Sequence, residues 1–221
     1  RRPPRSTLFP YTTLFRSVFR KSFVLKEGSQ SGEILICGLG FYDLFINGEK
    51  ITKGYLAPYI SNTDHIVYYD HYDLTPWLKA GENVIGVMLG DGFQNSKTRV
   101  WDFMDNVFNS APKLALSMKV ESDGEKQEFD AMDFSCKKGP IFFNDLRSGV
   151  FFDKREEEKG WDQPGFQEDE NWHKPILADR PRGKAKLCEA EPIAVVEERK
   201  PVKRSEEHTS ELQSPWHGVC R

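Results

Sequence analysis

The chain has 221 residues and carries 31 Lys and Arg against 34 Asp and Glu, which gives a formal net charge of −3 at pH 7. This acidic balance does not provide the basic surface that nucleic acids and anionic membranes bind, and no apolar run approaches the roughly 20 residues that cross a bilayer. The length allows one well-formed hydrophobic core, or one domain with a fragment of a second.

The two ends of the chain differ in character from the rest. Residues 1–17 show neither apolar periodicity nor helix caps, and they resemble the direct translation of a common short-read sequencing adapter. Residues 204–221 resemble the translation of the adapter at the opposite end of a sequencing insert. We interpret both as foreign tails, in preference to a basic tail for nucleic acid and an acidic amphipathic helix. Between them, residues 18–203 hold 25 basic and 31 acidic side chains, a net charge of −6.

Between these ends, short apolar segments alternate with Gly, Asn, Asp and Pro, a pattern that predicts strands. The expected strands cover residues 18–26, 33–37, 41–46, 49–52, 66–73, 83–89, 113–121, 126–130 and 133–137. A single helical turn is expected over residues 75–79, with Thr75 as its cap and Pro76 at its first position. Since long amphipathic helices are missing from the pattern, the chain is expected to be an all-β sandwich.

Residues 38–50, GLGFYDLFINGEK, combine a strand with a tight turn. Side chains from Phe41 to Ile46 alternate between two faces, of which one carries Phe41, Asp43 and Phe45 and is expected to be a packing surface. Asn47-Gly48 supplies the positive φ angles of a two-residue hairpin turn, after which the return strand begins.

This hairpin resembles the start of the N-terminal β-sandwich domain of bacterial α-L-rhamnosidases, with its pattern G-L-G-Y-Y-E-L-Y-I-N-G-K. Three further blocks follow in the order of that family, at residues 73–93, 139–172 and 191–202. The first resembles Y-D-V-T-x-x-L-K-x-G-x-N-x-I-G-V-x-L-G-x-G-W, with Phe93 where Trp is usual. The second resembles a stretch that ends in G-W-x-x-P-G-F-D-D-S-x-W. The third resembles the linker to the next rhamnosidase domain.

The resemblance implies a jelly-roll or galactose-binding-like β-sandwich over residues 18–180 and a linker over residues 181–203. In that family catalysis belongs to a helical barrel further along, so the chain is expected to be a non-catalytic accessory piece of an α-L-rhamnosidase. No catalytic residue is carried over. The implied partners are an L-rhamnose-containing glycan and the missing catalytic domain, with neither nucleic acid nor membrane; the cellular compartment is left open.

Two acidic runs of the chain are candidates for catalysis. Glycoside hydrolysis uses two carboxyl groups on opposite sides of the scissile bond. The acidic runs at residues 156–158 and 168–170 are interpreted as a solvated face. Cysteine and histidine do not have metal-ligand spacing, so no cofactor is expected apart from a possible calcium ion.

Sugar binding is the more favoured local chemistry, because a monosaccharide site needs an aromatic plane and polar groups for hydroxyls. The loops before residue 66 and after residue 89 are expected to meet at one end of the sandwich. The candidate carbohydrate-binding residues are Asp64, Asp91, Phe93, Asn95 and Trp101. Asp64 is also the candidate calcium ligand, although His65 follows it where related rhamnose-binding domains have Asn.

Three other roles remain open from the sequence. The domain could be a scaffold whose loops merely pack on the rest of the enzyme. It could be a carbohydrate-binding module that acts by itself. It could also be the sugar-binding sandwich of a β-galactosidase-like enzyme, which shares the Asn-Gly hairpin and the D-I-T-x-x-L-x-x-G-x-N element.

Overall fold

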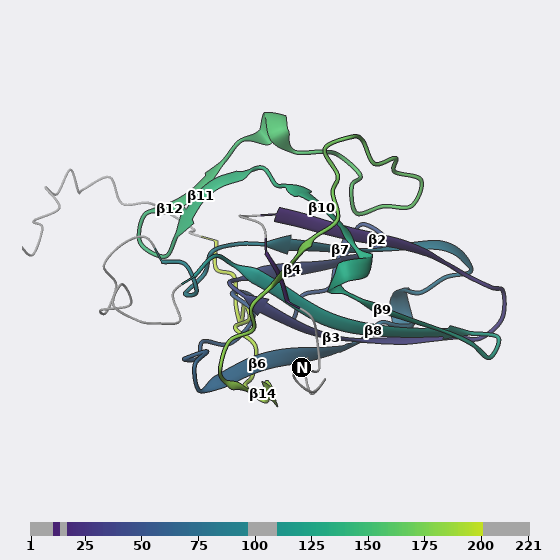
Figure 1. Cartoon of the computed structure of the whole chain (residues 1–221), viewed down its shortest axis with the longest axis horizontal. Helices are drawn as coiled ribbons and strands as arrows, with labels where there is room; N and C mark the ends of the chain where they lie inside the picture. The colour runs from purple at the N-terminus through teal and green to yellow at the C-terminus, as the bar shows by residue number, and fades with distance from the viewer. Residues whose placement is uncertain (1–10, 14–16, 97–109, 201–221) are drawn as a thin grey trace, which may run out of the picture.

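The computed structural model describes residues 11–13, 17–96 and 110–200, and most of its regular structure is strand. Two sheets face each other, and a separate two-stranded hairpin stands beside them (Figure 1). Within the described residues, no helix has the length and apolar character needed to cross a membrane. The predicted all-β sandwich is confirmed.

The larger sheet has seven strands. They are β1 (Tyr11–Thr13), β3 (Gln30–Leu39), β6 (Ile66–Asp73), β8 (Lys113–Ser122), β9 (Glu125–Asp130), β13 (Ile176–Ala178) and β14 (Lys184–Leu187). Their order is β13-β1-β8-β3-β6-β14, and β9 pairs with β8 beyond the short β1. All of these pairings are antiparallel except that of β14 with β6.

The smaller sheet has five antiparallel strands. They are β2 (Ser17–Leu25), β4 (Tyr42–Ile46), β5 (Glu49–Lys50), β7 (Gly81–Leu89) and β10 (Ser135–Lys138), in the order β10-β2-β7-β4-β5. The separate hairpin consists of β11 (Ile141–Asp145) and β12 (Gly149–Phe152). The other described elements are the 3-10 turns η1 (Thr75–Trp77), η3 (Ala131–Asp133) and η4 (Lys154–Glu156).

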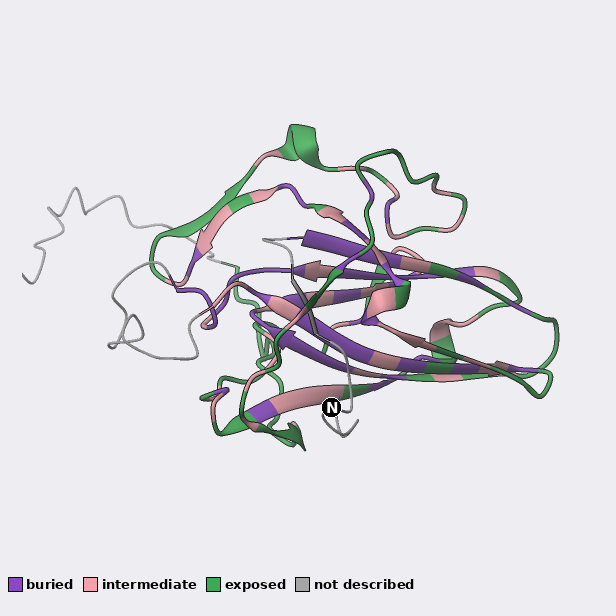
Figure 2. Cartoon of the chain, viewed as in Figure 1, coloured by how far each residue is buried: buried purple, intermediate pink, exposed green. Residues whose placement is uncertain are grey.

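The main core lies between the two sheets, and strands of both contribute to it (Figure 2). From the larger sheet come Ile34, Ile36, Leu116 and Met118, and from the smaller one Leu44, Ile46, Ile85 and Val87, all 0% exposed. Full burial of one such side chain stabilises the fold by about 1.5–3 kcal/mol. A one-residue slip of a strand would turn these side chains outward, so the alternation fixes the register.

The nine predicted strands all appear, with boundaries within three residues of those expected. The predicted helical turn is η1, but its expected cap is wrong. Leu74 occupies the cap position, and Thr75 Oγ1 instead accepts a hydrogen bond from Gly32 N at 3.2 Å. Thr75 therefore ties the turn to β3.

Three residues of the first presumed tail take part in the larger sheet. Thr12 of β1 pairs with Leu177 of β13 on one side and with Leu114 of β8 on the other. Strand pairing uses main-chain groups, which every residue except Pro provides in full. The sheet therefore begins before residue 18, and the foreign origin of residues 1–17 and 204–221 stays a prediction.

The segment after η4 covers the outer face of the smaller sheet. Trp161 and Trp172 are each 8% exposed and anchor it there. A Cβ on Gly86 would lie 2.8 Å from Trp161 Cζ3, so glycine leaves the room that the indole ring fills. Arg20, which is 3% exposed, donates from Nε to Trp161 O and from Nη1 to Glu168 Oε1, both at 2.8 Å. This explains why the block that contains Gly-Trp-Asp-Gln-Pro-Gly-Phe belongs to the sandwich.

Candidate functional site

Two glycine-containing turns lie against each other at one end of the sandwich and position the candidate site. Gly90 N donates to Phe41 O at 2.7 Å, next to the pairing of β4 with β7. A Cβ on Gly40 would lie 2.1 Å from Gly90 O, and one on Gly92 would lie 2.7 Å from Phe41 N. Their φ angles, 121° and 53°, are ones that residues with side chains rarely adopt. The contact between the two main chains therefore requires glycine at both positions.

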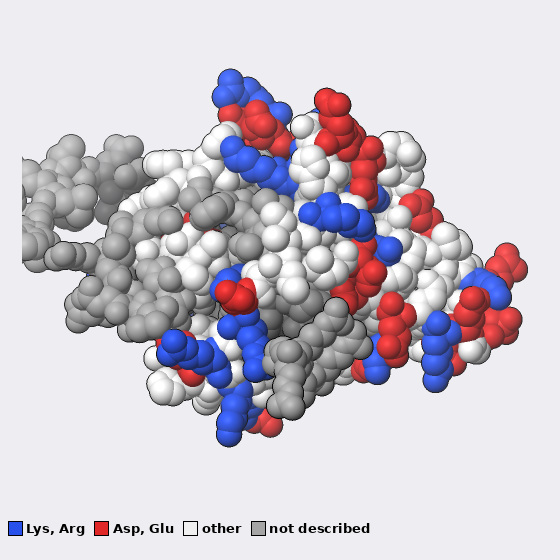
Figure 3. Space-filling model, viewed as in Figure 1, with Lys and Arg blue, Asp and Glu red and all other residues white. Residues whose placement is uncertain are grey.

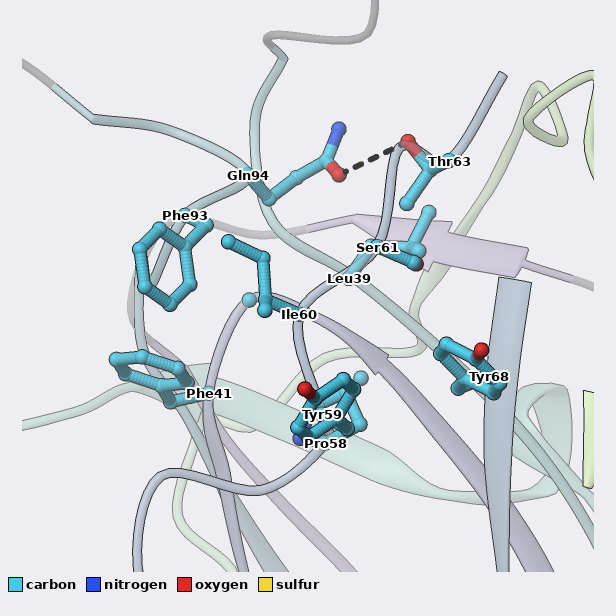
Figure 4. A pocket seen from close by; sticks show the side chains of 12 residues that line it. Leu39, Phe41, Pro58, Tyr59, Ile60, Ser61, Thr63, Tyr68, Phe93 and Gln94 are labelled. Atoms are coloured by element: carbon cyan, nitrogen blue, oxygen red, sulfur yellow. Dashed lines mark hydrogen bonds between the residues drawn. The ribbon is translucent and has the colours of Figure 1, made fainter. Parts of the chain in front are cut away.

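A shallow pocket opens beside these turns (Figure 4). Phe41 and Phe93 form one wall, with ring centroids 5.6 Å apart and planes at 85°, the edge-to-face geometry that aromatic pairs favour. Tyr59 and Tyr68 form a second edge-to-face pair at 6.1 Å. The other lining residues are Gly38, Leu39, Gly40, Pro58, Ile60, Ser61, Thr63 and Gln94. The pocket therefore combines aromatic faces with hydroxyl and amide groups.

The polar side of the pocket joins two loops that are distant in sequence. Thr63 Oγ1 donates to Gln94 Oε1 at 3.3 Å, as the dashed line in Figure 4 shows. Gln94 Nε2 in turn donates to Ser110 Oγ at 2.9 Å. Gly183 N donates to Thr63 O at 3.0 Å, so the segment before β14 holds the same loop. The loops before residue 66 and after residue 89 thus meet, as the sequence predicts.

Two of the candidate binding residues are buried behind the lining of the pocket and do not line it. Asp91 is 0% exposed and Asn95 is 6% exposed. Asn95 Nδ2 donates to Asp91 Oδ1 at 2.6 Å, and Asp91 N donates to Asn144 Oδ1 at 2.9 Å. These contacts shape the loop that carries Phe93. In the described geometry, Asp91 and Asn95 position an aromatic residue of the pocket.

Asp64 follows the pocket residue Thr63 in a turn closed by Asn62. Asp64 N donates to Asn62 Oδ1 at 3.0 Å, and its side chain is half-buried. Calcium takes six to eight oxygen ligands, commonly from several carboxylates. Among the residues that the structure describes, no three His, Cys, Asp or Glu side chains gather as a metal site. A calcium ion at Asp64 stays a prediction, and Trp101 lies outside the described residues.

A chain of hydroxyl groups links β4 of one sheet to β6 of the other. Lys53 N donates to Tyr72 Oη at 3.2 Å, the hydroxyl oxygens of Tyr72 and Tyr42 lie 3.0 Å apart, and Tyr42 Oη donates to Asp70 Oδ2. Burial raises the pKa of Asp70 above its ordinary value, although the bond from Tyr42 opposes this. Burial also raises the pKa of Tyr42 well above its ordinary value. The chain acts as a polar tie between the sheets.

The two acidic runs have structural contacts. Glu158 Oε2 accepts hydrogen bonds from Lys137 Nζ at 3.0 Å and from Trp172 Nε1 at 3.2 Å. Glu168 accepts from the buried Arg20. On the face drawn in Figure 3, Lys and Arg side chains lie among Asp and Glu. These carboxylates stabilise the covering segment of the smaller sheet.

The sequence did not identify most of the aromatic lining. Strand alternation predicts a packing face for Phe41, and no sequence pattern marks Tyr59 or Tyr68 as site residues. Phe45 of the same face does pack, with its ring 5.6 Å from Trp161, whereas Phe41 precedes β4 and turns into the pocket. One signal was present: the loop between β5 and β6 runs over residues 51–65 and contains two Tyr, and long loops are commonly functional.

Comparison with known proteins gives consistent matches. The model of the α-L-rhamnosidase N-terminal domain family matches residues 29–197. An α-L-rhamnosidase of Formosa agariphila is 34% identical over 161 residues, which are 71% of this chain and 17% of that protein. One of Streptomyces avermitilis is 30% identical over 136 residues, or 61% of this chain and 13% of that protein. The chain thus spans 13–17% of the length of these curated relatives.

Solved structures show the same likeness. The α-L-rhamnosidase from Dictyoglumus thermophilum superposes with a TM-score of 0.74 and 32% identity, covering 90% of this chain and 22% of that one. The Streptomyces avermitilis α-L-rhamnosidase complexed with L-rhamnose superposes with a TM-score of 0.65 and 25% identity, covering 84% of this chain and 17% of that one.

Proposed function

The chain belongs to the family of α-L-rhamnosidase N-terminal domains, and from this we propose that it is a non-catalytic accessory domain of a longer α-L-rhamnosidase. The family match over residues 29–197 carries the proposal. It removes the support for a β-galactosidase-like parent, which rested on shared motifs. The contacts of the acidic runs agree with a non-catalytic role, because Glu158 and Glu168 are engaged in stabilising the fold.

The pocket beside Phe41 and Phe93 supports carbohydrate binding as the activity of this domain. L-Rhamnose has an apolar ring face and a methyl group, which aromatic side chains can cover. Ser61, Thr63 and Gln94 provide hydroxyl and amide groups at the polar side, as a site for sugar hydroxyls requires. A scaffold role without sugar binding is the competing function, and the interlocked turns would serve it equally well.

Titration of the whole chain with L-rhamnose separates these two functions. A binding module shows saturable heat in calorimetry and shifts of the Phe93 and Thr63 signals in NMR spectra. If millimolar sugar produces neither heat nor shifts, the scaffold role is the function that remains. Repeating the titration with calcium and with a chelator tests Asp64, because a calcium-dependent site would lose its affinity in the chelator.

Hydrolysis provides the second test. Purified chain incubated with a nitrophenyl α-L-rhamnoside should release no more nitrophenol than boiled chain does. Release above that control would overturn the non-catalytic assignment, whatever the titration shows.

A further inference from the structure

Six apolar side chains, each more than half exposed, lie where the chain leaves the sandwich. These residues, here called the exit platform, are Tyr55, Leu56, Tyr59, Ile193, Val195 and Val196. The first four line one groove between the loop after β5 and the segment after β14. Val196 is 97% exposed, and in Figure 2 the segment after β14 has the colour of exposed residues. Monomeric proteins seldom leave such a surface open unless it binds something.

The two halves of the exit platform are held together by main-chain contacts. Tyr55 N donates to Ile193 O at 2.9 Å. A Cβ on Gly54 would lie 2.3 Å from Ile193 O, so glycine at this position permits the close approach. Cys188 N donates to Tyr69 O at 2.8 Å and continues the pairing of β14 with β6. The platform is therefore prearranged, and its formation adds little ordering cost to an association.

Leu56 is the most informative member of the platform. It is 54% exposed and has a φ of 58°, a left-handed conformation that is costly for a residue with a branched side chain. The fold thus holds an apolar side chain toward solvent in a strained conformation. Strain of this kind is typical of positions that serve recognition.

We propose that the exit platform docks the domain that follows this one in the longer α-L-rhamnosidases. The inference rests on the proposed function, since it requires a longer parent enzyme. The family match ends at residue 197, directly after Val196, while the chain spans only 17% of its 34% identical relative. In such a protein the following polypeptide emerges at the platform itself.

Charged residues border the platform, as they border ordinary protein interfaces. Lys53, Glu189 and Glu191 line the same groove as Tyr55 and Ile193. An apolar centre with a polar rim is the arrangement of protein–protein interfaces. The fitting partner is therefore a folded domain with an apolar patch, and a second copy of this chain is the competing occupant.

The test uses the whole chain and, as a separate polypeptide whose cooperative thermal unfolding first establishes that it is folded, the part of the Formosa agariphila relative that follows its aligned region. Sedimentation velocity should show a complex of the two. Leu56→Asn and Val195→Asp should each weaken the association at least tenfold. Asn tolerates a positive φ better than Leu does, so Leu56→Asn relieves backbone strain, and its thermal unfolding compared with that of the unchanged chain checks that it folds. Phe151→Asp is the matched control, because Phe151 is 64% exposed on β12 outside the platform.

Three results would overturn the docking proposal: no complex, equal weakening by Phe151→Asp, or self-association of the chain alone that Leu56→Asn abolishes. The last result would assign the platform to a second copy. L-Rhamnose titration of Leu56→Asn keeps the two proposals apart. If sugar binding persists while docking is lost or never seen, only the docking proposal fails.

Discussion

The side chains of Asn47 and Asn83 meet at one end of the smaller sheet, where Asn47 Nδ2 donates to Asn83 Oδ1 at 3.0 Å. Asn47 and Gly48 form the predicted hairpin turn, with φ angles of 52° and 86°. Asn47 Nδ2 also donates to Trp77 O at 3.1 Å, and its Oδ1 accepts from Val84 N at 2.9 Å. One side chain thus joins the β4–β5 turn, η1 and β7.

Replacement of Asn47 should separate its two contributions to stability. Asn47→Ala loses the three hydrogen bonds and adds the cost of a positive φ, so we expect it to lower the free energy of unfolding by about 2–4 kcal/mol. Asn47→Gly keeps the φ freely and should cost about 1–3 kcal/mol. Urea denaturation measures both. Equal losses would show that the φ angle has no effect, and wild-type stability in both would contradict the role of the hydrogen bonds.

The ion pair between Arg20 and Glu168 should matter more than a surface pair. Glu168→Gln leaves the guanidinium of Arg20, which is 3% exposed, without its countercharge. Because Glu168 is itself 33% exposed, we expect a loss of about 1–2 kcal/mol, below the value for a fully buried pair. Glu128→Gln is the control, since its pair with Lys119 is exposed and 3.8 Å long; it should change stability by less than about 0.5 kcal/mol. Similar losses in the two variants would contradict a special role for Arg20.

If the pocket binds L-rhamnose, Phe93 should provide part of the affinity through its aromatic face. Phe93→Leu keeps an apolar side chain but removes the ring, and we expect binding to weaken about three- to tenfold. Calorimetric titration measures the change. Phe151→Leu, on the hairpin away from the pocket, should bind as the unchanged chain does. Undiminished affinity in Phe93→Leu would place the sugar elsewhere.

Asp70 should give the protein a pH dependence opposite to that of a salt-bridged carboxylate. Burial raises the pKa of Asp70 on folding, against the effects of Tyr42 and Lys53. A carboxyl group with a raised pKa stabilises the fold below its unfolded pKa, about 4, and this contribution is lost as pH rises through the folded pKa. The stability of the wild type relative to Asp70→Asn should therefore fall as the pH is raised above about 4. Urea denaturation of both proteins across this range checks it, and a constant or rising difference would contradict it.

Cys136 should be inert in the folded protein. Burial raises the pKa of its thiol to about 11, which the charge of Lys174 only partly offsets. At pH 8, iodoacetamide should modify the half-buried Cys188 well before Cys136, as mass spectrometry of the peptides would show. Unfolded protein, in which both should react, is the control. Equal rates in the folded chain would contradict the burial of Cys136.

Most of the strands that the sequence predicts have a strong pattern of burial; β5 and β9, which have no buried residue, are the exceptions. β4 alternates and β7 is apolar from Val84 to Leu89 apart from Gly86, so a strand is the clear prediction for both. The sequence does not predict β1, β11, β12, β13 or β14. In β12 and β14 all residues are exposed, so no pattern of burial marks these two strands. Their strand geometry comes from pairing with β11 and β6, which a local sequence pattern does not record.

The site was predictable in position and only partly in its residues. Phe93 and the loop of Asp64 do lie at one end of the sandwich, because they follow and precede recognisable strands. Asp91 and Asn95 are buried behind the lining of the pocket, because the Asn95 side chain donates a hydrogen bond to the Asp91 carboxylate four residues earlier. A polar loop residue can face a ligand or its own loop, and sequence spacing fits both. The packing face predicted for Phe41 rests on strand alternation. Phe41 lies just before β4, where that alternation does not apply.

Because of the contact of Gly40 with Gly90 and Gly92, the backbone that supports the pocket does not depend on the side chains that line it. Main-chain atoms make that contact, so the side chains above it can be exchanged while the two turns keep their places. Phe41 and Phe93 occupy positions that tolerate such exchange, since each is carried by a turn fixed from beneath. The end of this sandwich is therefore a natural place for engineering new ligand preferences: a library at these two positions and at Tyr59 would vary recognition on a constant backbone.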